Sequence, residues 1–247
     1  MKALLATLVP ITLALSLFAA VGLAQDKTTK AVDPSGTWRW EYDFGGETMK
    51  DSLRLNLGKD KKLAGHYKGR EDKWIEIKDA KVEGDSLSFL LPLDFQGTPL
   101  KLEFAGKVKG DEIEGNVKVS TGEGAQEFPW APKRSVLIED VVGEWQMKIE
   151  AGDRTLEPVV TITKDGEKYK GKYVSGQEFS AELSDLKVEN NQLIFNVAGE
   201  VNGTKIKADY KGRPYGDKIQ GSIAYVLGDN SGDIEFTGTR KPVDSKP

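Results

Sequence analysis

Residues 36–44 read GTWRWEYDF, and every second position from Trp38 to Phe44 is aromatic. An alternation with a period of two is typical of a β-strand that buries one of its faces. Arg39, Glu41 and Asp43 occupy the positions between the rings, and charged side chains of this kind cannot face lipid. The stretch therefore predicts a strand with one face in a protein core and the other in water, which excludes a membrane-spanning barrel.

The chain contains one domain twice. KVEGDSLSF at 81–89 matches KVENNQLIF at 187–195, and GDEIEG at 110–115 matches GDKIQG at 216–221, with the same spacing between copies. The opening stretch itself matches GEWQMKIEA at 143–151. We therefore expect two tandem copies of one fold.

Each copy divides into eight short alternating runs, separated by Gly, Asn and Asp residues that suit tight hairpins. Closing eight antiparallel strands into a barrel removes the unpaired edges and leaves an interior for side chains or one small ligand. The sequence thus predicts an all-β chain of two tandem eight-stranded antiparallel up-and-down β-barrels. A pair of β-sandwiches is the alternative.

Two irregularities shared by the copies favour the barrel. Glycines interrupt the inner face at matching places, where a strongly coiled sheet needs positions without a side chain. These glycines are Gly65, Gly106 and Gly115 in the first copy and Gly171, Gly212 and Gly221 in the second. The alternation also slips phase at Asp79 and Asp185, where we predict a β-bulge or bend.

The N-terminus predicts export. Lys2 precedes an apolar run from Ala3 to Ala24 that ends in small residues, as in a cleaved secretory signal peptide. An uncleaved membrane anchor is the alternative, because the run is long enough to cross a bilayer, but Pro10 and the small residues favour cleavage. We expect a secreted or periplasmic bacterial protein that does not span the membrane after cleavage.

These features divide the chain into six parts. They are a signal peptide (1–24), an N-terminal linker (25–35), barrel 1 (36–134), a connector (135–142), barrel 2 (143–241) and a C-terminal tail (242–247). The connector is apolar and poor in Gly and Ser, so it is expected to dock against the barrels and not to act as a flexible linker.

Composition excludes several classes of function. The 35 Lys and Arg residues against 39 Asp and Glu give a net charge of −4, spread along the chain, which does not favour nucleic acid. The sequence has no Cys and one His, His66, so the common zinc sites and nucleophile–His pairs are not available. The strand phase assigns no carboxylate clearly to either barrel interior, which argues against an acid–base pair there. We expect a non-enzymatic protein without a metal or other cofactor.

Each copy begins with Gly-x-Trp on its first strand and ends with an Arg on its last, giving the pairs Trp38 with Arg134 and Trp145 with Arg240. This pattern resembles the lipocalin and calycin family, and within it the tandem lipocalin-like domains of uncharacterised secreted bacterial proteins. The resemblance implies an eight-stranded barrel in which the first-strand Trp plugs one end and the late Arg packs across it. A guanidinium over an indole face is a favourable cation–π pair.

The copies differ in the size of their interior side chains. Trp40, Tyr42 and Phe44 of the first copy correspond to Met147, Ile149 and Ala151 of the second. Eight-stranded barrels are barely wide enough for their own side chains, so we expect a filled barrel 1 and more free space in barrel 2. A small apolar or amphipathic ligand is then expected in barrel 2, with candidate contacts Met147, Ile149, Tyr173, Phe195, Val197, Ala208 and Tyr210.

Two further hypotheses stay open at this point. Both interiors could be packed solid, which would make the protein a structural or protein-interaction module of the cell envelope. Trp74 lies out of phase with its apolar neighbours, so it could serve as an exposed platform for a sugar or a partner, or pack between the barrels.

Overall fold

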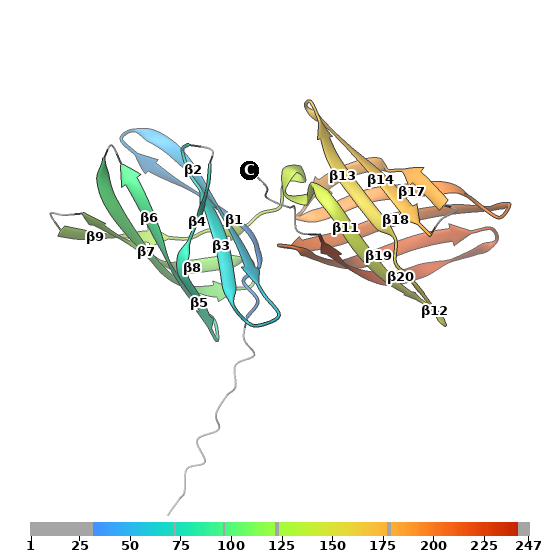
Figure 1. Ribbon diagram of the computed structural model, residues 1–247, viewed down its shortest axis with the longest axis horizontal. Helices are drawn as coiled ribbons and strands as arrows, with labels where there is room; N and C mark the ends of the chain where they lie inside the picture. Colours follow the sequence, from blue (N-terminus) through green and yellow to red (C-terminus); the bar gives the residue numbers. More distant parts are fainter. Residues whose placement is uncertain (1–31, 72, 96, 122–123, 177–178, 242–247) are drawn as a thin grey trace, which may run out of the picture.

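The computed structural model describes residues 32–71, 73–95, 97–121, 124–176 and 179–241 (Figure 1). The predicted signal peptide, most of the N-terminal linker and the C-terminal tail lie outside the described residues, so these assignments stay predictions. Within the described ranges, no helix combines the length and the apolar character needed to cross a bilayer.

The first sheet of the described chain contains ten strand segments. They are β1 (Gly36–Phe44), β2 (Glu47–Leu57), β3 (Leu63–Lys68), β4 (Trp74–Glu76), β5 (Lys78–Glu83), β6 (Ser86–Phe95), β7 (Thr98–Lys109), β8 (Glu112–Thr121), β9 (Gly124–Trp130) and β10 (Lys133–Arg134). The order is β4-β3-β2-β1-β10-β8-β7-β6-β5, with β9 also paired to β8. β4 and β5 are the two halves of one bent strand that pairs with β3 on one side and β6 on the other, so the sheet closes on itself.

The second sheet repeats this arrangement. Its segments are β11 (Gly143–Ala151), β12 (Arg154–Leu156), β13 (Val159–Asp165), β14 (Lys168–Ser175), β15 (Phe179–Glu182), β16 (Ser184–Glu189), β17 (Gln192–Val201), β18 (Thr204–Tyr215), β19 (Lys218–Leu227) and β20 (Asn230–Arg240). All ladders in both sheets are antiparallel, and β15–β16 is the bent strand that closes barrel 2. The predicted fold of two eight-stranded up-and-down barrels is confirmed, with some strands interrupted into two segments.

The predicted bulges lie in the bent strands. The register shifts between Lys78 and Lys81 in barrel 1 and between Ser184 and Lys187 in barrel 2. Asp79 and Asp185 both have φ of 51°, a left-handed conformation that Asp tolerates better than bulky residues do. The bulge turns the strand from one neighbour to the other, and this turn closes each barrel.

Paired glycines allow the closest approach of neighbouring strands. Gly106 faces Gly115 across β7 and β8, and Gly212 faces Gly221 across β18 and β19. A methyl group on Gly221 would collide with the backbone carbonyl of Lys211. These positions therefore need glycine because of space and not because of an unusual φ.

We predict that Gly221→Ala lowers the free energy of unfolding of barrel 2 by about 3 kcal/mol, since backbone cannot move aside as a flexible side chain can. Gly232→Ala is the matched control, because its new methyl group would meet only the Tyr225 side chain, with the nearest atom 3.1 Å away. Urea unfolding of both variants measures the difference. Equal losses in the two variants would contradict the steric account.

The two barrels meet through the ends at which Trp38 and Trp145 are buried. The β18–β19 turn of barrel 2 lies against barrel 1, where Asn56 Nδ2 donates to Asp217 Oδ2 over 2.8 Å. Lys218 Nζ lies 3.6 Å from Asp33 Oδ2, and Arg213 forms a salt bridge with Asp111. The β1–β2 and β8–β9 hairpins consequently lie at one extremity of the molecule and the β17–β18 and β19–β20 hairpins at the other (Figure 1). The ends of the barrels opposite these plugs face away from each other (Figure 1).

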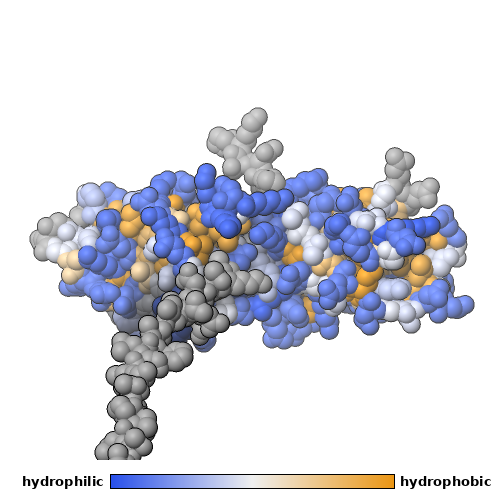
Figure 2. All heavy atoms as spheres, turned by 90° about the horizontal axis from the view of Figure 1, so that it is seen from below, coloured by the Kyte–Doolittle hydropathy of each residue, from blue (hydrophilic) through white to orange (hydrophobic). Residues whose placement is uncertain are grey.

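The face shown in Figure 2 is largely hydrophilic, with patches of apolar residues over both barrels. His66 is exposed on β3, as its phase predicts. Trp74 is half-buried on the outside of barrel 1, where the Arg54 guanidinium lies 4.1 Å from its ring centre. A fully exposed Trp74 platform is therefore wrong, because Arg54 covers the indole face.

Candidate functional site

Each predicted Trp–Arg pair is brought together at the inner end of its barrel. The Arg134 guanidinium lies 4.2 Å from the Trp38 ring centre, and that of Arg240 lies 5.1 Å from Trp145. Both indoles are fully buried and donate to main-chain carbonyls, Trp38 to Pro34 and Trp145 to Val141, each over 2.8 Å. These ends are plugged, so a ligand could enter only from the opposite end or through the wall.

The connector is fastened to both barrels through Asp140, in the short 3₁₀ helix η1 (Ile138–Val141). Its buried carboxylate accepts hydrogen bonds from Arg39 over 2.8 Å and Arg54 over 2.9 Å, both in barrel 1. Its main-chain carbonyl accepts from Arg240 of barrel 2 over 2.6 Å. The connector is thus docked against both barrels. The three arginines and Asp140 hold it in place.

The candidate ligand contacts of barrel 2 form one packed cluster. All seven are core residues, and none exposes more than 6% of its surface: Met147, Ile149, Tyr173, Phe195, Val197, Ala208 and Tyr210. Phe195 and Tyr210 stack with ring centres 4.6 Å apart, and the Tyr210 hydroxyl donates to that of Tyr173 over 3.3 Å. Burial raises the pKa of Tyr210, so this pair is neutral at physiological pH.

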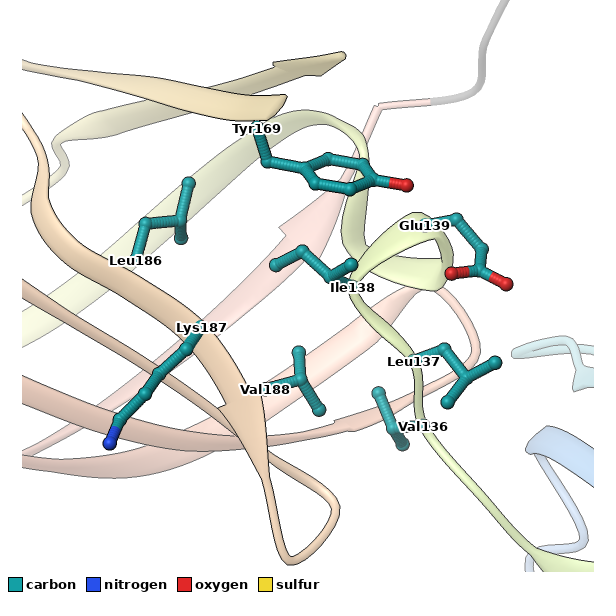
Figure 3. Close-up of a pocket in the computed structure, with 8 residues that line it drawn as sticks. All are labelled: Val136, Leu137, Ile138, Glu139, Tyr169, Leu186, Lys187 and Val188. Carbon is teal, nitrogen blue, oxygen red and sulfur yellow. The ribbon is translucent and has the colours of Figure 1, made fainter. Parts of the chain in front are cut away.

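Two hollows are described on the outside of the barrels. One, of about 400 Å³, lies between the connector and strands β14 and β16, with Ile138, Tyr169 and Leu186 in its lining (Figure 3). The other, of about 380 Å³, lies over β5, β6 and β7 of barrel 1. Neither lies within the cluster predicted for barrel 2, and greater free space in that interior stays a prediction.

Barrel 1 contains a buried carboxylate that the sequence analysis placed wrongly. Asp51 on β2 lies directly opposite Trp40 on β1 and exposes only 5% of its surface. The Tyr67 hydroxyl donates to Asp51 Oδ2 over 2.6 Å. Asp51 is in phase with buried Leu53 and Leu55, so the alternation itself carried the signal. The expectation of no interior carboxylate is wrong because a Tyr donor makes burial of this acid tolerable.

Aromatic rings cluster around Trp40, the residue opposite Asp51 in the strand register. The Trp40 ring centre lies 6.2 Å from that of Tyr67, 6.3 Å from Phe104 and 5.9 Å from Trp130. The indole nitrogen of Trp130 is buried and has no hydrogen-bond partner among the described residues. A buried N–H donor without an acceptor is uncommon in a protein core, so this part of barrel 1 could still form a hydrogen bond with a bound molecule.

The barrel wall is incomplete beside Trp40. β1 pairs with β10 only through Trp38 and Arg39, whereas β11 pairs with β20 at five positions from Trp145 to Ile149. Pro132 stands where the next ladder residue would be, and proline has no N–H to donate. Among the described residues β9 pairs with β8 and not with β1, which leaves a seam between β1 and β9.

Exposed aromatic side chains lie at the same end of barrel 1. Tyr42 exposes 43% of its surface, Phe44 62% and Phe128 46%. We call the group of Trp40, Tyr42, Asp51, Tyr67 and Trp130 the mouth cluster. It combines apolar rings with a few polar atoms, as small-molecule sites do.

The electrostatics of the mouth cluster are dominated by burial. Burial raises the pKa of the Asp51 carboxyl, and hydrogen bonds from Tyr67 and Tyr42 oppose this shift without cancelling it. Burial and the neighbouring carboxylate together raise the pKa of Tyr67. Asp51 therefore binds a proton more tightly in the folded chain than in the unfolded chain.

This shift gives a test with a defined sign. Between the ordinary Asp pKa of about 3.9 and the raised folded value, the folded state holds more protons, so Asp51 lowers the stability as pH rises through this window. Asp51→Asn removes this titrating group, so the variant should not lose stability in this way. The difference in the free energy of unfolding, variant minus unaltered protein, should therefore increase as pH rises. Urea unfolding at several pH values from about 4 to 7 measures it.

Asp165→Asn is the control for this prediction. The Lys170 ammonium holds the pKa of exposed Asp165 below its usual range, so removing that carboxylate should not produce a gain with rising pH. A pH-independent difference for Asp51→Asn would contradict the assigned burial of its charge.

Within the described ranges, no three His, Asp or Glu side chains are placed to hold a metal ion together. The absence of a cofactor stays an expectation from the sequence.

Comparisons with known proteins leave the family open. No family model matches the chain, and no curated protein matches it. A Bacteroides fragilis protein whose name assigns it to the outer membrane is 11% identical, with a TM-score of 0.30, over 84% of this chain and 98% of its own. A Nostoc punctiforme protein of unknown function from the DUF3598 family is 11% identical, with a TM-score of 0.28, over 85% and 97%.

A double mutant of transferrin binding protein B from Haemophilus parasuis is also similar, at 11% identity and a TM-score of 0.21, over 81% of this chain and 55% of that protein. Identities and TM-scores this low carry no argument about function. The functional inference therefore rests on the residues of this chain.

Proposed function

We propose that this is an exported, non-enzymatic, lipocalin-like protein that binds a small amphipathic ligand at the open end of barrel 1. The observation that carries the proposal is the buried Asp51 carboxylate, held by Tyr67 within the aromatic mouth cluster. Binding sites for small molecules are mostly apolar, with a few placed polar groups that orient the ligand. The mouth cluster has this composition.

The strand pairing favours the same end of the barrel. The inner end is plugged by Trp38 and Arg134, whereas the seam at which β1 and β9 do not pair lies beside Trp40. A ligand that reached the mouth cluster through this seam would cover the exposed rings of Tyr42 and Phe128, whose apolar area otherwise stays in water. Burial of that area favours an apolar portion in the ligand.

A binding role is favoured over catalysis by the chemistry of the cluster. Asp51 is the one carboxylate assigned to it, and the described hydrogen bond comes from a Tyr whose pKa is raised. General acid–base catalysis works best with groups that titrate near the working pH and with a second reacting group in reach. Export is supported by the N-terminal sequence pattern, which predicts a secreted or periplasmic location.

Barrel 2 is the alternative location for the proposed ligand. Its interior side chains are smaller than those of barrel 1, which is the reason for the original prediction. Both clusters are packed, but the polar atoms of the barrel 2 contacts are paired, as in Tyr210 and Tyr173, whereas the Trp130 indole nitrogen in barrel 1 has no partner among the described residues. A closed, satisfied core gains less from a ligand than an incomplete one does.

The alternative function is a protein-interaction module of the cell envelope. The exposed Tyr42, Phe44 and Phe128 and the unpaired edges of β1 and β9 favour it, because unpaired strand edges can accept a strand from a partner. This reading needs no small molecule in either barrel.

The test is native mass spectrometry of the protein purified from its exporting host, followed by solvent extraction. We expect a copurifying small molecule that is lost from Trp40→Leu and retained by Met147→Leu, the matched change in barrel 2. Loss from Met147→Leu alone would move the site to barrel 2. Repeated absence of any small molecule would contradict the proposal and favour the interaction module.

A further inference from the structure

Among the residues that the structure describes, no Lys, Arg or His forms a salt bridge with the Asp51 carboxylate. The described salt bridges use the charged groups of the outer surface and of the barrel interface, and none of them reaches Asp51. The groups that act on it are the hydroxyls of Tyr67 and Tyr42, which are neutral donors. An ionised carboxylate withdrawn from water without a counter-charge costs several kcal/mol, so the site is complementary to a positive charge.

The rings around Asp51 have the same preference. Trp40 lies opposite Asp51 in the strand register and borders Tyr67 and Trp130, and Tyr42 follows on the same face of β1. Aromatic faces attract cations, most strongly those of Trp and most of all where water is excluded. Carboxylate and ring faces together select an ammonium group over a neutral or anionic one.

Barrel 2 lacks this combination. The strand register places Met147 and Pro158 at the positions of Trp40 and Asp51, since Trp145 lies opposite Val160 as Trp38 lies opposite Leu53. A thioether and a proline offer neither the charge nor the ring face. The cation-selective pattern is therefore a property of barrel 1 and not of the repeated fold.

We propose that the mouth cluster recognises an organic cation, the amine or quaternary ammonium group of an amphipathic molecule, with the charge against Asp51 and the apolar portion along the seam between β1 and β9. This inference rests on the proposed function, because it assigns a ligand class to that site. The Trp130 indole N–H, buried and without a partner among the described residues, lies next to Trp40 and is available to an acceptor atom on the same ligand.

The site has an inherent dependence on pH. The titratable groups facing Asp51 are Tyr42 from β1 and Tyr67 from β3, and both have pKa values raised above the usual value for Tyr. Asp51 is then the group that changes charge in the acidic to neutral range. A cation needs the ionised form, so its affinity should rise with pH through the raised Asp51 pKa.

The experiment compares three probes with the same alkyl chain, decyltrimethylammonium, decanol and decanoate, each below its micellar concentration, by isothermal titration calorimetry on the full chain. We expect the cation to bind about tenfold or more tightly than either other probe, which corresponds to about 1.4 kcal/mol. Asp51→Asn should remove this preference and its pH dependence while decanol binding is retained. Trp40→Leu should weaken binding of the cation without removing a charge.

Glu41→Gln is the matched control, because it removes one carboxylate from the outer face of β1, the strand next to that of Asp51, where Glu41 pairs with Lys50. This variant should keep the cation preference. Equal binding of all three probes would overturn the cation assignment and leave the proposed function intact. Binding of none of the probes would count against both the cation assignment and the proposed function. An equal loss of cation preference in Glu41→Gln and Asp51→Asn would mean that the preference comes from general surface charge and not from Asp51.

Discussion

The arginine stacked on a buried tryptophan at the inner end of each barrel is the interaction on which the rest of the structure depends. Arg134 covers Trp38 and also pairs with Asp111, which in turn binds Arg213 of barrel 2. Burial alone would raise the pKa of Asp111, but these two arginines hold it below its usual range, so the link is ionic at neutral pH. Arg134 thus plugs barrel 1 and, through Asp111, joins it to barrel 2.

Arg240 has the corresponding position in barrel 2. It bonds to Asp217, which accepts from Asn56 of barrel 1, and to the carbonyl of Asp140 in the connector. Because each barrel uses its plugged end as the interface, the other ends of the two barrels lie at opposite extremities of the molecule (Figure 1).

The two copies of the fold differ at many interior positions, and three of the differences concern the mouth cluster and the wall beside it. Asp51 stands where the strand register of barrel 2 has Pro158, Trp130 where it has Phe236, and Pro132 where it has Gly238. Each change in barrel 1 adds a polar atom to the interior or removes a ladder hydrogen bond from the wall. Polar groups and open edges are costly in a purely structural barrel, and functional sites are where such costs are expected.

The sequence predicted the elements that depend on local pattern. Period-two alternation identified the strands, the repeat identified the two barrels, and the phase slips at Asp79 and Asp185 marked the bulges that close them. Asp51 was missed because the strand phase was taken to place no carboxylate inside either barrel, although Asp51 is in phase with buried Leu53. The seam could not be predicted, since it depends on which distant strands fail to pair, and Pro132 is a signal only once β10 is known to lie beside β1.

Our proposal is that the buried Asp51 carboxylate, which accepts a hydrogen bond from Tyr67 and has no cationic partner among the described residues, makes the end of barrel 1 a cation site. It is tested most directly by following the Asp51 side-chain carboxyl carbon by NMR across a pH titration, with the Asp51→Asn spectrum giving the assignment. The free protein should show an Asp51 pKa above the ordinary value, and saturating decyltrimethylammonium should lower it, because a bound cation stabilises the ionised form. An ordinary pKa in the free protein, or a raised one that the cation leaves unchanged, would contradict the account.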